Sequence, residues 1–278
     1  MTVTRAFLFA HPAKHSLSPP MHNAALTALG IAATYVARDV APSDLRAALE
    51  DLRTSGAWGA NLSIPHKEQA LEWLDAVSDD ARDIGAVNTV VVKNAALHGC
   101  NTDGLGFMRS LEEAGLTSVV GLEVLILGAG GAARGVGYAL KAAGADVAIW
   151  NRTPTRAQRL AAEFGLKAVS DAALEPRVRA AQLLVNTTAV GLEDAHSSPL
   201  PDGWLPHQGW VCDIVYRPLE TKLLRDAAQA GLQTVDGLGM LVHQGALALE
   251  LWLEAQGIAG KPDAAIMRAA ALEALQQP

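Results

Sequence analysis

The sequence predicts an α/β protein of two domains: an N-terminal α/β domain completed by C-terminal helices, and a second domain built on a parallel sheet with helices on both faces. Strand-like and helix-like segments alternate before Cys100, and a sharper alternation begins near Gly121. From Met240 onward the pattern is helical, without a strand signal. A chain of 278 residues can bury two cores. We place the first domain at residues 1–103 and 238–278, and the second at 104–237.

The first domain begins with β-rich runs that alternate with helical patterns. Leu45, Leu49 and Leu52 follow Ser43 at helical spacing, which predicts a helix with Ser43 as its N-cap. Two short runs flank Asn94-Ala95 as the arms of a hairpin. The strands expected here are Arg5–Ala10, Thr34–Val40, Trp58–Ile64, Val87–Lys93 and Ala96–Cys100, and the other helices are Met21–Leu29 and His66–Leu74.

The second domain is expected to alternate strand and helix more regularly. A β-rich run over Glu123–Leu127 enters a Gly-rich turn, and helical periodicity then continues to Ala143. Thr153 as N-cap, Pro154 after it and Gly165 at the end bound the next helix. Further strands are expected at Asp146–Trp150, Gln182–Asn186, Trp210–Val215 and Gln233–Val235, and helices at Leu105–Ala114, Met240–Gln256 and Asp263–Gln276. The last two helices are assigned to the first domain.

Composition and charge exclude several classes of protein. Acidic residues exceed basic ones by 29 to 22, for a net charge of −7, so the chain lacks the footprint of a general nucleic-acid binder. No apolar stretch is long enough to span a membrane, and Ala6–Ala10 is too short for a signal peptide. Cys100 and Cys212 cannot form a disulfide framework. We therefore expect a cytoplasmic protein with neither a nucleic-acid nor a membrane partner.

A glycine-rich turn indicates a dinucleotide site. The segment Gly128-Ala-Gly-Gly-Ala-Ala-Arg134 follows a predicted strand and opens a predicted helix. Gly128 permits the tight turn, Gly130 lets the backbone approach a pyrophosphate, and the small Ala133 allows close packing of helix on strand. An Ala/Gly-rich turn without a ligand is the alternative. With this turn, the second domain is predicted to be Rossmann-like.

The end of the next strand indicates which dinucleotide binds. NAD sites usually carry Asp or Glu there, to accept a hydrogen bond from the ribose 2′-hydroxyl. This chain instead has Asn151, Arg152 and Thr153, with Arg156 one helical turn beyond Arg152. Two guanidinium groups suit a 2′-phosphate, and a cation at a helix N-terminus is unfavourable unless an anion joins it. The sequence therefore favours NADP, although a solvated helix start would also carry arginines.

Three polar clusters outside this domain lie at predicted strand ends or loops. They are His15-Ser-Leu-Ser-Pro-Pro-Met-His-Asn23, Asn61-Leu-Ser-Ile-Pro-His-Lys67, and Asn88-Thr with Asn101-Thr-Asp103. Neutral hydroxyls and amides with one lysine and one aspartate suit a polyhydroxylated small molecule and the transfer of one proton.

Each cluster also has a purely structural interpretation. Ser16 and Ser18 can be turn and cap residues, Lys67 a solvated lysine, and Asp103 the N-cap of the following helix. The catalytic interpretation requires one shared site, which periodicity cannot establish.

The motifs in these clusters resemble those of shikimate dehydrogenases, and the similarity extends over nearly the whole chain. The first cluster resembles the family's substrate-carboxylate loop, and the second its Asn-Val-Thr-x-Pro-x-Lys motif. Further similar segments are Gly85-Ala-Val-Asn-Thr89, Asn101-Thr-Asp-Gly104, Asn151-Arg-Thr-Pro-Thr-Arg156, Val185-Asn-Thr-Thr188, Asp213-Ile-Val-Tyr-Arg-Pro218 and Gly237-Leu-Gly-Met-Leu-Val-His-Gln-Gly245.

The resemblance implies a role for each matching residue. Lys67 and Asp103 are implied as the acid/base pair of an NADP-dependent reduction of 3-dehydroshikimate to shikimate, in aromatic amino-acid biosynthesis. The implied substrate-binding residues are Ser16, Ser18, Asn61, Ser63, Asn88, Tyr216 and Gln244. The implied cofactor-binding residues are Gly128, Ala129, Gly130, Gly131, Ala132, Asn151, Arg152, Thr153, Arg156, Thr187, Gly237 and Met240. A monomer or homodimer without a metal is expected.

The sequence departs from the family pattern at two places, and three alternative functions have to be weighed against this interpretation. Ser63 replaces the usual threonine, which leaves acceptance of quinate open, and Ala10-His-Pro12 replaces the usual Gly-x-Pro. A quinate enzyme would typically use NAD, which Arg152 and Arg156 disfavour. A methylenetetrahydrofolate dehydrogenase would not explain Ser16, Ser18 and Asp103 together, and an NADPH sensor would not need the Lys67/Asp103 pair.

Overall fold

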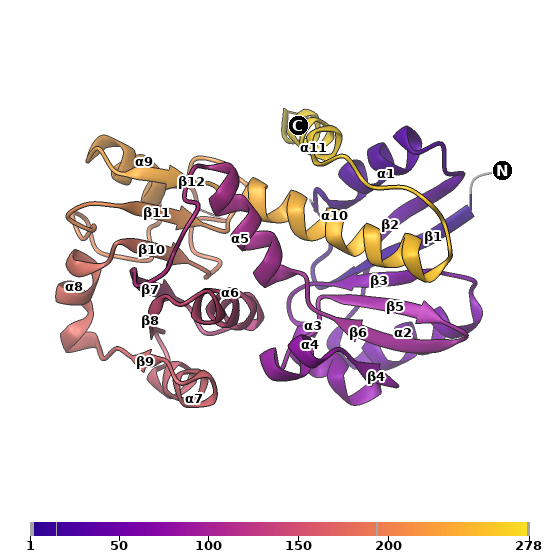
Figure 1. Cartoon of the computed structure of the whole chain (residues 1–278), viewed down its shortest axis with the longest axis horizontal. Coiled ribbons are helices and arrows are strands. Elements are labelled where there is room, and N and C mark those ends of the chain that lie inside the picture. Colours follow the sequence, from indigo (N-terminus) through magenta and orange to yellow (C-terminus); the bar gives the residue numbers. More distant parts are fainter. Residues whose placement is uncertain (1–2, 15, 193, 277–278) are drawn as a thin grey trace. The chain divides into compact units, whose positions relative to one another are not determined.

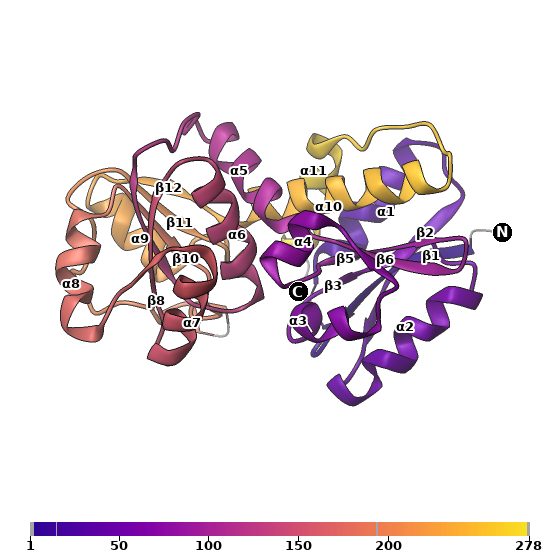
Figure 2. The same ribbon diagram turned by 60° about the horizontal axis from the view of Figure 1, so that its bottom comes forward.

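The computed structural model describes residues 3–14, 16–192 and 194–276, and the chain divides into two compact units. Unit 1 runs as far as Asp103 and resumes at Val242, and unit 2 comprises Gly104–Leu241. The second border falls inside helix α10 (Gly237–Ala255), which the two labelled views show as one continuous helix (Figures 1 and 2). Each unit has its own six-stranded sheet.

Unit 1 contains a mixed sheet of order β2-β1-β3-β5-β6-β4. Strand β1 pairs in parallel with β2 and β3, whereas β5 is antiparallel to both β3 and β6, and β4 is parallel to β6. The strands are β1 (Val3–Ala10), β2 (Ala33–Asp39), β3 (Gly59–Leu62), β4 (Ala76–Val77), β5 (Thr89–Lys93) and β6 (Ala96–Cys100). The helices are α1 (Ser18–Ala28), α2 (Leu45–Thr54), α3 (His66–Gln69), α4 (Asp79–Ile84), most of α10, and α11 (Ala264–Gln276).

The register of this sheet brings three polar segments to one edge. Asn61 on β3 lies opposite Thr89 on β5, and Thr89 lies opposite Cys100 on β6. Because β5 runs against its two neighbours, its first residue meets the ends of β3 and β6. The segments that follow β3 and β6, and the one that precedes β5, therefore start from the same edge.

Both faces of the unit 1 sheet are covered. Leu45, Leu49 and Leu52 of α2 pack on one face, and α1 and α10 lie on the other (Figures 1 and 2). On the α10 side, the indole Nε1 of Trp252 donates to the carbonyl oxygen of Val90 at 2.9 Å. A Cβ at Gly59 would lie 1.9 Å from that carbonyl oxygen and 2.5 Å from the indole Nε1, so only glycine leaves room for this hydrogen bond.

Unit 2 contains the all-parallel sheet that the sequence predicts. Its order is β12-β11-β10-β7-β8-β9, the doubly wound order in which the first strand lies centrally. The strands are β7 (Glu123–Leu127), β8 (Asp146–Trp150), β9 (Lys167–Ala168), β10 (Leu183–Asn186), β11 (Trp210–Asp213) and β12 (Gln233–Val235). The helices are α5 (Asp103–Glu113), α6 (Gly131–Ala142), α7 (Pro154–Phe164), α8 (Asp171–Ala180) and α9 (Lys222–Gln229).

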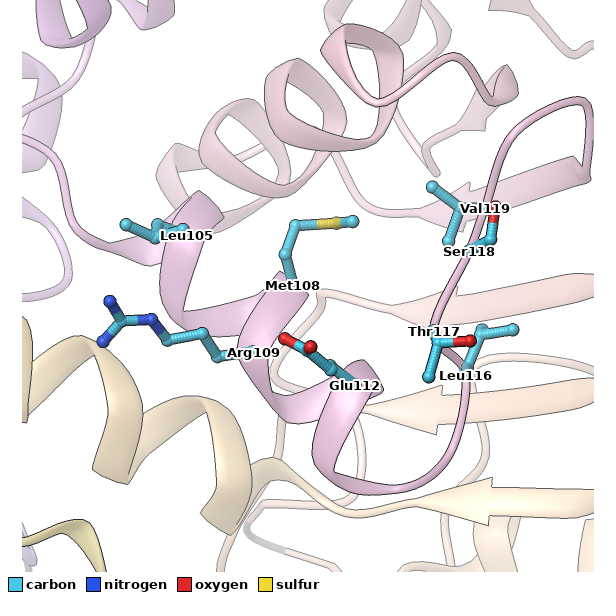
Figure 3. A pocket seen from close by; sticks show the side chains of 8 residues that line it. All are labelled: Leu105, Met108, Arg109, Glu112, Leu116, Thr117, Ser118 and Val119. Atoms are coloured by element: carbon cyan, nitrogen blue, oxygen red, sulfur yellow. The ribbon is translucent and has the colours of Figure 1, made fainter.

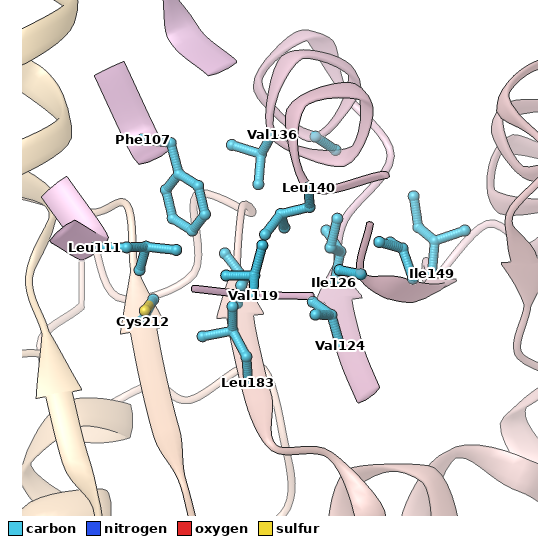
Figure 4. Close-up of a cluster of buried hydrophobic side chains, with 14 of the residues drawn as sticks. Phe107, Leu111, Val119, Val124, Ile126, Val136, Leu140, Ile149, Leu183 and Cys212 are labelled. Atoms are coloured by element: carbon cyan, nitrogen blue, oxygen red, sulfur yellow. The ribbon is translucent and has the colours of Figure 1, made fainter. Parts of the chain in front are cut away.

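Alternate residues of the unit 2 strands fill two separate cores. Val124 and Ile126 of β7 face Phe107 of α5 and Leu140 of α6 in the cluster of Figure 4. The intervening Leu125 and Leu127 pack on the other face, against residues of α8 and α9. Strands buried on both faces read as continuous apolar runs, as β7 does. The predicted Rossmann-like fold of this unit is confirmed.

The structure corrects several predicted boundaries and caps. The expected helix 66–74 is a short α3 followed by a 3₁₀ turn over Ala70–Trp73, and α1 begins three residues before Met21, with two prolines in its first turn. Asp44, and not Ser43, precedes α2, and the hydroxyl of Ser43 donates to the Asp44 carboxylate. Thr153 precedes α7 but makes no capping hydrogen bond. The short elements β4, α4, α8, β9 and α9 were not predicted.

Candidate active site

Lys67 and Asp103, which are 36 positions apart, meet at the edge of the unit 1 sheet. The ammonium Nζ of Lys67 donates to Asp103 Oδ2 at 2.5 Å. The Lys67 side chain is 15% exposed and the Asp103 side chain 3%. Asp103 is the first residue of α5 and not its N-cap, and its backbone N–H donates to the side chain of Asn101. A partly exposed ammonium group beside a buried carboxylate can pass a proton to a ligand while the two side chains stay in contact.

The amide of Asn88 orients the carboxylate. Asn88 Nδ2 donates to Asp103 Oδ1 at 2.8 Å and to the hydroxyl of Thr102 at 2.9 Å. Asn88 Oδ1 accepts from the backbone N–H of Thr102 at 2.8 Å and from the hydroxyl of Thr89 at 3.0 Å. Both oxygens of Asp103 therefore accept from fixed donors, so the carboxylate cannot rotate without losing one of them.

Asn61 lies deeper in the sheet than its motif suggests. It is 5% exposed, and its Nδ2 donates to the backbone oxygen of Asn88 and to the hydroxyl of Thr89. Its Oδ1 accepts from the hydroxyl of Tyr35 at 2.9 Å. Both amide hydrogens of Asn61 therefore already have acceptors in the protein. Sequence reasoning did not single out Tyr35, because a tyrosine in a β-rich run reads as a core residue.

The proposed carboxylate-binding serines lie at the start of α1. The backbone N–H of Ser18, the first residue of α1, donates to the hydroxyl of Ser16 at 3.2 Å. Ser18 is buried and Ser16 half-buried, and neither caps the helix from the preceding position, which Leu17 occupies. His15, the first residue of the motif, is outside the described residues. Ser63 is half-buried just beyond the end of β3.

Gln244 lies beside this cluster, and Tyr216 lies in unit 2. Gln244 projects from α10, where its Oε1 accepts from Asn88 Nδ2 at 3.4 Å and its backbone oxygen accepts from the hydroxyl of Thr102 at 3.0 Å. Tyr216 is half-buried in the segment after β11. The structure thus brings Lys67, Asp103, Asn88 and Gln244 into one hydrogen-bonded cluster within unit 1.

The glycine-rich turn of unit 2 has the geometry of an anion site. Gly128 follows β7 with φ +110°, a backbone conformation that favours glycine, and a Cβ there would lie 2.6 Å from the hydroxyl oxygen of Thr187. A Cβ at Gly130 would meet no atom within 4 Å, so space is open above the turn. Gly130 precedes α6 without a capping side chain, which leaves the first N–H groups of that helix for a ligand. Ala129, Gly131 and Ala132 complete the turn and are partly exposed, and Ala133 is buried in the core beneath it.

The two arginines after β8 are exposed and unpaired. Arg152 and Arg156 make no ion pair or side-chain hydrogen bond with any described residue, whereas Arg159 on the same helix pairs with Glu163. Asn151 Nδ2 donates to the backbone oxygen of Thr153 and so shapes the turn that carries Arg152. The first turn of α7 contains no acidic residue. A dianionic phosphate would complement this positive helix start.

The remaining predicted cofactor residues lie around the carboxyl ends of the unit 2 strands. The backbone N–H and the hydroxyl of Thr187 both donate to the carbonyl oxygen of Leu127, directly before the glycine turn. A Cβ at Gly237 would lie 2.3 Å from the carbonyl oxygen of Ile214, so this close approach requires glycine. Met240 is buried in the same core as Ile126.

The buried carboxylate of Asp213 connects the ends of neighbouring strands in the unit 2 sheet by hydrogen bonds. Asp213 was not among the predicted site residues. Asp213 is 1% exposed at the end of β11, and it accepts from Asn186 Nδ2, from the backbone N–H of Val215 and from the hydroxyl of Thr221. Burial raises the pKa of Asp213 to about 6, although these three hydrogen bonds oppose the shift. Thr221 also caps α9, so one carboxylate ties together the ends of β10, β11 and α9.

Two other features of the described residues lie apart from these clusters. No group of three potential metal ligands occurs among them, and His11 Nδ1 instead lies 2.6 Å from the Asp39 carboxylate. Figure 3 shows the side chains that line a surface hollow between α5 and the segment after it, with the Arg109 guanidinium extending away from that segment. The volume of this hollow is about 260 Å³. Its lining residues are Leu105, Met108, Arg109, Glu112, Leu116, Thr117, Ser118 and Val119. None of the predicted site residues lines this hollow. No helix in the described ranges is long and apolar enough to cross a membrane.

Comparison with known proteins matches both units to one family. Residues 8–90 match the shikimate dehydrogenase substrate binding domain, residues 111–192 match shikimate / quinate 5-dehydrogenase, and residues 237–256 match the shikimate 5′-dehydrogenase C-terminal domain.

Individual relatives cover almost the whole chain. A shikimate dehydrogenase (NADP(+)) of Thermus thermophilus is 50% identical over 248 residues, which are 89% of this chain and 92% of that protein. The Moorella thermoacetica shikimate dehydrogenase (NADP(+)) is 49% identical over 255 residues, covering 88% and 86%. The crystal structure of a shikimate 5-dehydrogenase from Thermus thermophilus, in complex with NADP(H) and shikimate, has a TM-score of 0.90 at 46% identity and covers 99% of this chain and 100% of its own. The chain therefore belongs to the shikimate dehydrogenase family.

Proposed function

We propose that the protein catalyses the reversible, NADPH-dependent reduction of 3-dehydroshikimate to shikimate in aromatic amino-acid biosynthesis. The observation that carries the chemistry is the 2.5 Å contact between Lys67 Nζ and the buried Asp103 carboxylate, among neutral hydroxyl and amide groups. Such a cluster binds a polyhydroxylated molecule and moves one proton. Membership in the family and the identity to NADP-dependent relatives support the same reaction.

The glycine turn and the arginines of unit 2 fit NADPH. The open N-terminus of α6 would hold the pyrophosphate above Gly128–Ala132, and Arg152 and Arg156 would bind the 2′-phosphate, with Asn151 and Thr153 shaping that turn. Thr187, Gly237 and Met240 are assigned to the nicotinamide side. When bound, NADPH supplies the hydride.

Lys67 serves as the proton donor in the reductive direction. Its ammonium group donates to the carbonyl oxygen of 3-dehydroshikimate as the carbonyl carbon gains the hydride, so that the C=O bond becomes CH–OH. In oxidation, neutral Lys67 accepts the same proton. Asp103 keeps the amine in place and accepts from the substrate hydroxyl, while Asn88 holds the carboxylate.

The other polar residues position the substrate. Ser16 and Ser18 would hold its carboxylate, because both hydroxyls lie at the start of α1, where helix N–H groups favour an anion. Ser63, Tyr216 and Gln244 are assigned to the ring hydroxyls. Asn61, with its amide hydrogens already engaged, would act by supporting Asn88 and Thr89.

Initial rates with two cofactors and two substrates test this function. We expect shikimate with NADP⁺ to exceed both shikimate with NAD⁺ and quinate with either cofactor. Efficient quinate oxidation with NAD⁺ would instead assign the protein to quinate metabolism, and it would show that Ser63 and the arginines do not select as proposed. Binding of NADPH without turnover of either substrate would indicate a sensor.

We also propose that the enzyme acts in the cytoplasm as a monomer or homodimer. The two cysteines, Cys100 and Cys212, are unpaired thiols, which suits a reducing compartment. Sedimentation equilibrium measures the mass directly, and a trimer or larger assembly would contradict the proposal.

A further inference from the structure

His22 and Asn23, in the first polar cluster of the sequence, have no role in the proposed chemistry. Both side chains contact Tyr35. The side-chain amide of Asn23 accepts from the Tyr35 backbone N–H at 2.7 Å and donates to its carbonyl oxygen at 3.0 Å. The ring of His22 stacks on the Tyr35 ring at 4.2 Å with an interplanar angle of 6°. His22 and Asn23 on α1 therefore fix both the backbone and the ring of one residue on β2.

A chain of hydrogen bonds leads from Tyr35 to the catalytic pair. The Tyr35 hydroxyl donates to Asn61 Oδ1 at 2.9 Å, and Asn61 Nδ2 donates to the Thr89 hydroxyl at 3.1 Å. Thr89 donates to Asn88 Oδ1 at 3.0 Å, and Asn88 Nδ2 donates to Asp103 Oδ1 at 2.8 Å. Every donor in this chain points toward Asp103, which is the acceptor at its end.

The chemistry of the partners fixes this direction. A backbone N–H can only donate, so the Thr102 N–H requires Asn88 to present its oxygen there and its nitrogen to Asp103. Asn88 Oδ1 also faces the Thr89 hydroxyl, which must therefore donate to it and accept from Asn61. Asn61 then has only its oxygen to present to Tyr35. Reversal of Asn88 would place its nitrogen against the Thr102 N–H, and reversal of Asn61 would place its oxygen against the Asn88 carbonyl oxygen, both in a buried region.

We infer that Tyr35, held by His22 and Asn23, is a positioning residue for catalysis: its hydroxyl supplies the first hydrogen bond of the buried chain that holds the Asp103 carboxylate toward Lys67. The inference rests on the proposed acid/base role of Lys67 and Asp103. Tyr35 touches neither of these residues and acts through Asn61, Thr89 and Asn88. Without its hydroxyl, the oxygen of Asn61 is buried without a donor, and only the two hydrogen bonds that Asn61 Nδ2 donates still hold the amide.

Substitution of the hydroxyl alone tests this role. Tyr35→Phe keeps the ring stacked on His22 and removes only the hydroxyl. Loss of one neutral hydrogen bond corresponds to a loss of about threefold to tenfold. We expect this loss in kcat, with KM for NADP⁺ unchanged. Thr89→Val should give the same loss, and Thr89→Ser, which keeps the hydroxyl, should restore kcat. Tyr138 on α6, whose ring packs edge-on against Phe164, is a tyrosine outside this hydrogen-bond chain, so Tyr138→Phe is the control and should retain the wild-type kcat. A Tyr35→Phe variant with wild-type kcat and only a lower unfolding temperature would overturn the inference.

Two further measurements separate this inference from the proposed function. The Tyr35→Phe/Thr89→Val double variant should lose no more kcat than either single variant, because both break the same chain; multiplied losses would show independent effects. Hydrogen exchange at the Thr102 amide, which donates to Asn88 Oδ1, reports on the chain without any substrate. Tyr35→Phe should accelerate this exchange even if shikimate proves not to be the substrate. Unchanged exchange in that variant would refute the coupling, whatever the reaction is.

Discussion

At the residue scale, the two members of the proposed acid/base pair, Lys67 and Asp103, lie in different environments although they contact each other. Asp103 is almost fully buried and accepts from two fixed donors, whereas the Lys67 side chain stays partly open. Burial of the carboxylate preserves the geometry, and exposure of the amine lets it reach a ligand. The roles of the two residues therefore predict different mutational outcomes.

Removal of the Lys67 amine should impair turnover far more than binding. A positioned proton donor contributes about 10²- to 10⁴-fold to rate, so Lys67→Ala should lower kcat by that factor while KM for shikimate changes little. Lys93→Ala removes an exposed lysine at the end of β5 and serves as the control. Steady-state kinetics of both variants decide the matter, and a wild-type kcat for Lys67→Ala would exclude the proposed role.

His22 should make the folded protein sensitive to acid. Burial lowers the pKa of His22 to about 3 from 6.5, so the folded state holds the ring neutral. A lowered histidine pKa gives stability that is present above pH 6.5 and lost as pH falls toward 3, at about 1.4 kcal/mol per pH unit. The His22→Phe variant keeps the stack on Tyr35 without the titration. Its free energy of unfolding should therefore fall less steeply than that of the wild type between pH 6.5 and 4.5, as urea titrations would measure. His196→Phe, which alters an exposed histidine, should leave the slope unchanged.

At the scale of elements, the start of α7 is the proposed determinant of the choice of cofactor. Its exposed arginines have no acidic partner in the described part of the chain, and its first turn contains no carboxylate to accept from a ribose hydroxyl. Arg152→Ala and Arg156→Ala should each raise KM for NADP⁺ about tenfold or more, the worth of a charge-assisted hydrogen bond, and leave KM for NAD⁺ unchanged. Arg159→Ala changes a residue of the same helix that pairs with Glu163, so it should alter neither constant. Equal losses with the two cofactors would contradict a 2′-phosphate site.

Asp213, at the end of β11, predicts a pH dependence of stability opposite to that of His22. The folded pKa of Asp213, about 6, exceeds the ordinary 3.8, so its contribution to stability is present below pH 3.8 and lost as pH rises through 6. Asp213→Asn removes the titration. From pH 4 to 7, the variant should gain about 2 kcal/mol of unfolding free energy relative to wild type, as denaturant titrations at several pH values would measure. A constant difference between the two proteins would mean that Asp213 is charged throughout.

The sequence patterns predicted four strands, β6, β7, β8 and β12, with the bounds that the structure has. The predicted bounds of β7 and β8 match the structure, because strands buried on both faces are continuous apolar runs with polar ends. Helix α8 was missed because Pro176 lies inside it, where a proline normally ends a helix. Helix α9 did carry a signal, since Thr221 caps it and Leu223, Leu224 and Ala227 have helical spacing. The two-residue strands β4 and β9 are too short for any periodicity.

The candidate site was predictable wherever chemistry and motif coincide. Lys67, Asp103 and Asn88 were identified from residue type and resemblance, and the structure brings them together. Tyr35 and Asp213 were not, because their roles arise from strand pairing and burial, which bring distant residues into contact. Asn61 shows the same limit. Its motif predicts contact with the substrate, whereas the pairing of β3 with β5 directs its amide to the backbone of Asn88 and the hydroxyl of Thr89.

At the scale of the whole molecule, unit 2 is a continuous insertion in unit 1, and this arrangement has a consequence during translation. All of Gly104–Leu241 emerges from the ribosome before the rest of α10, so unit 2 can fold while one face of the unit 1 sheet still lacks Trp252. Protease digestion of stalled nascent chains should find Gly104–Leu241 protected earlier than the segment before it, and earlier protection of β1 to β6 would contradict this order. Asn88 and Thr102 likewise lack their hydrogen bonds to Gln244 until that residue has been synthesised. The growing chain should therefore be able to hold its nucleotide before its acid/base cluster is complete.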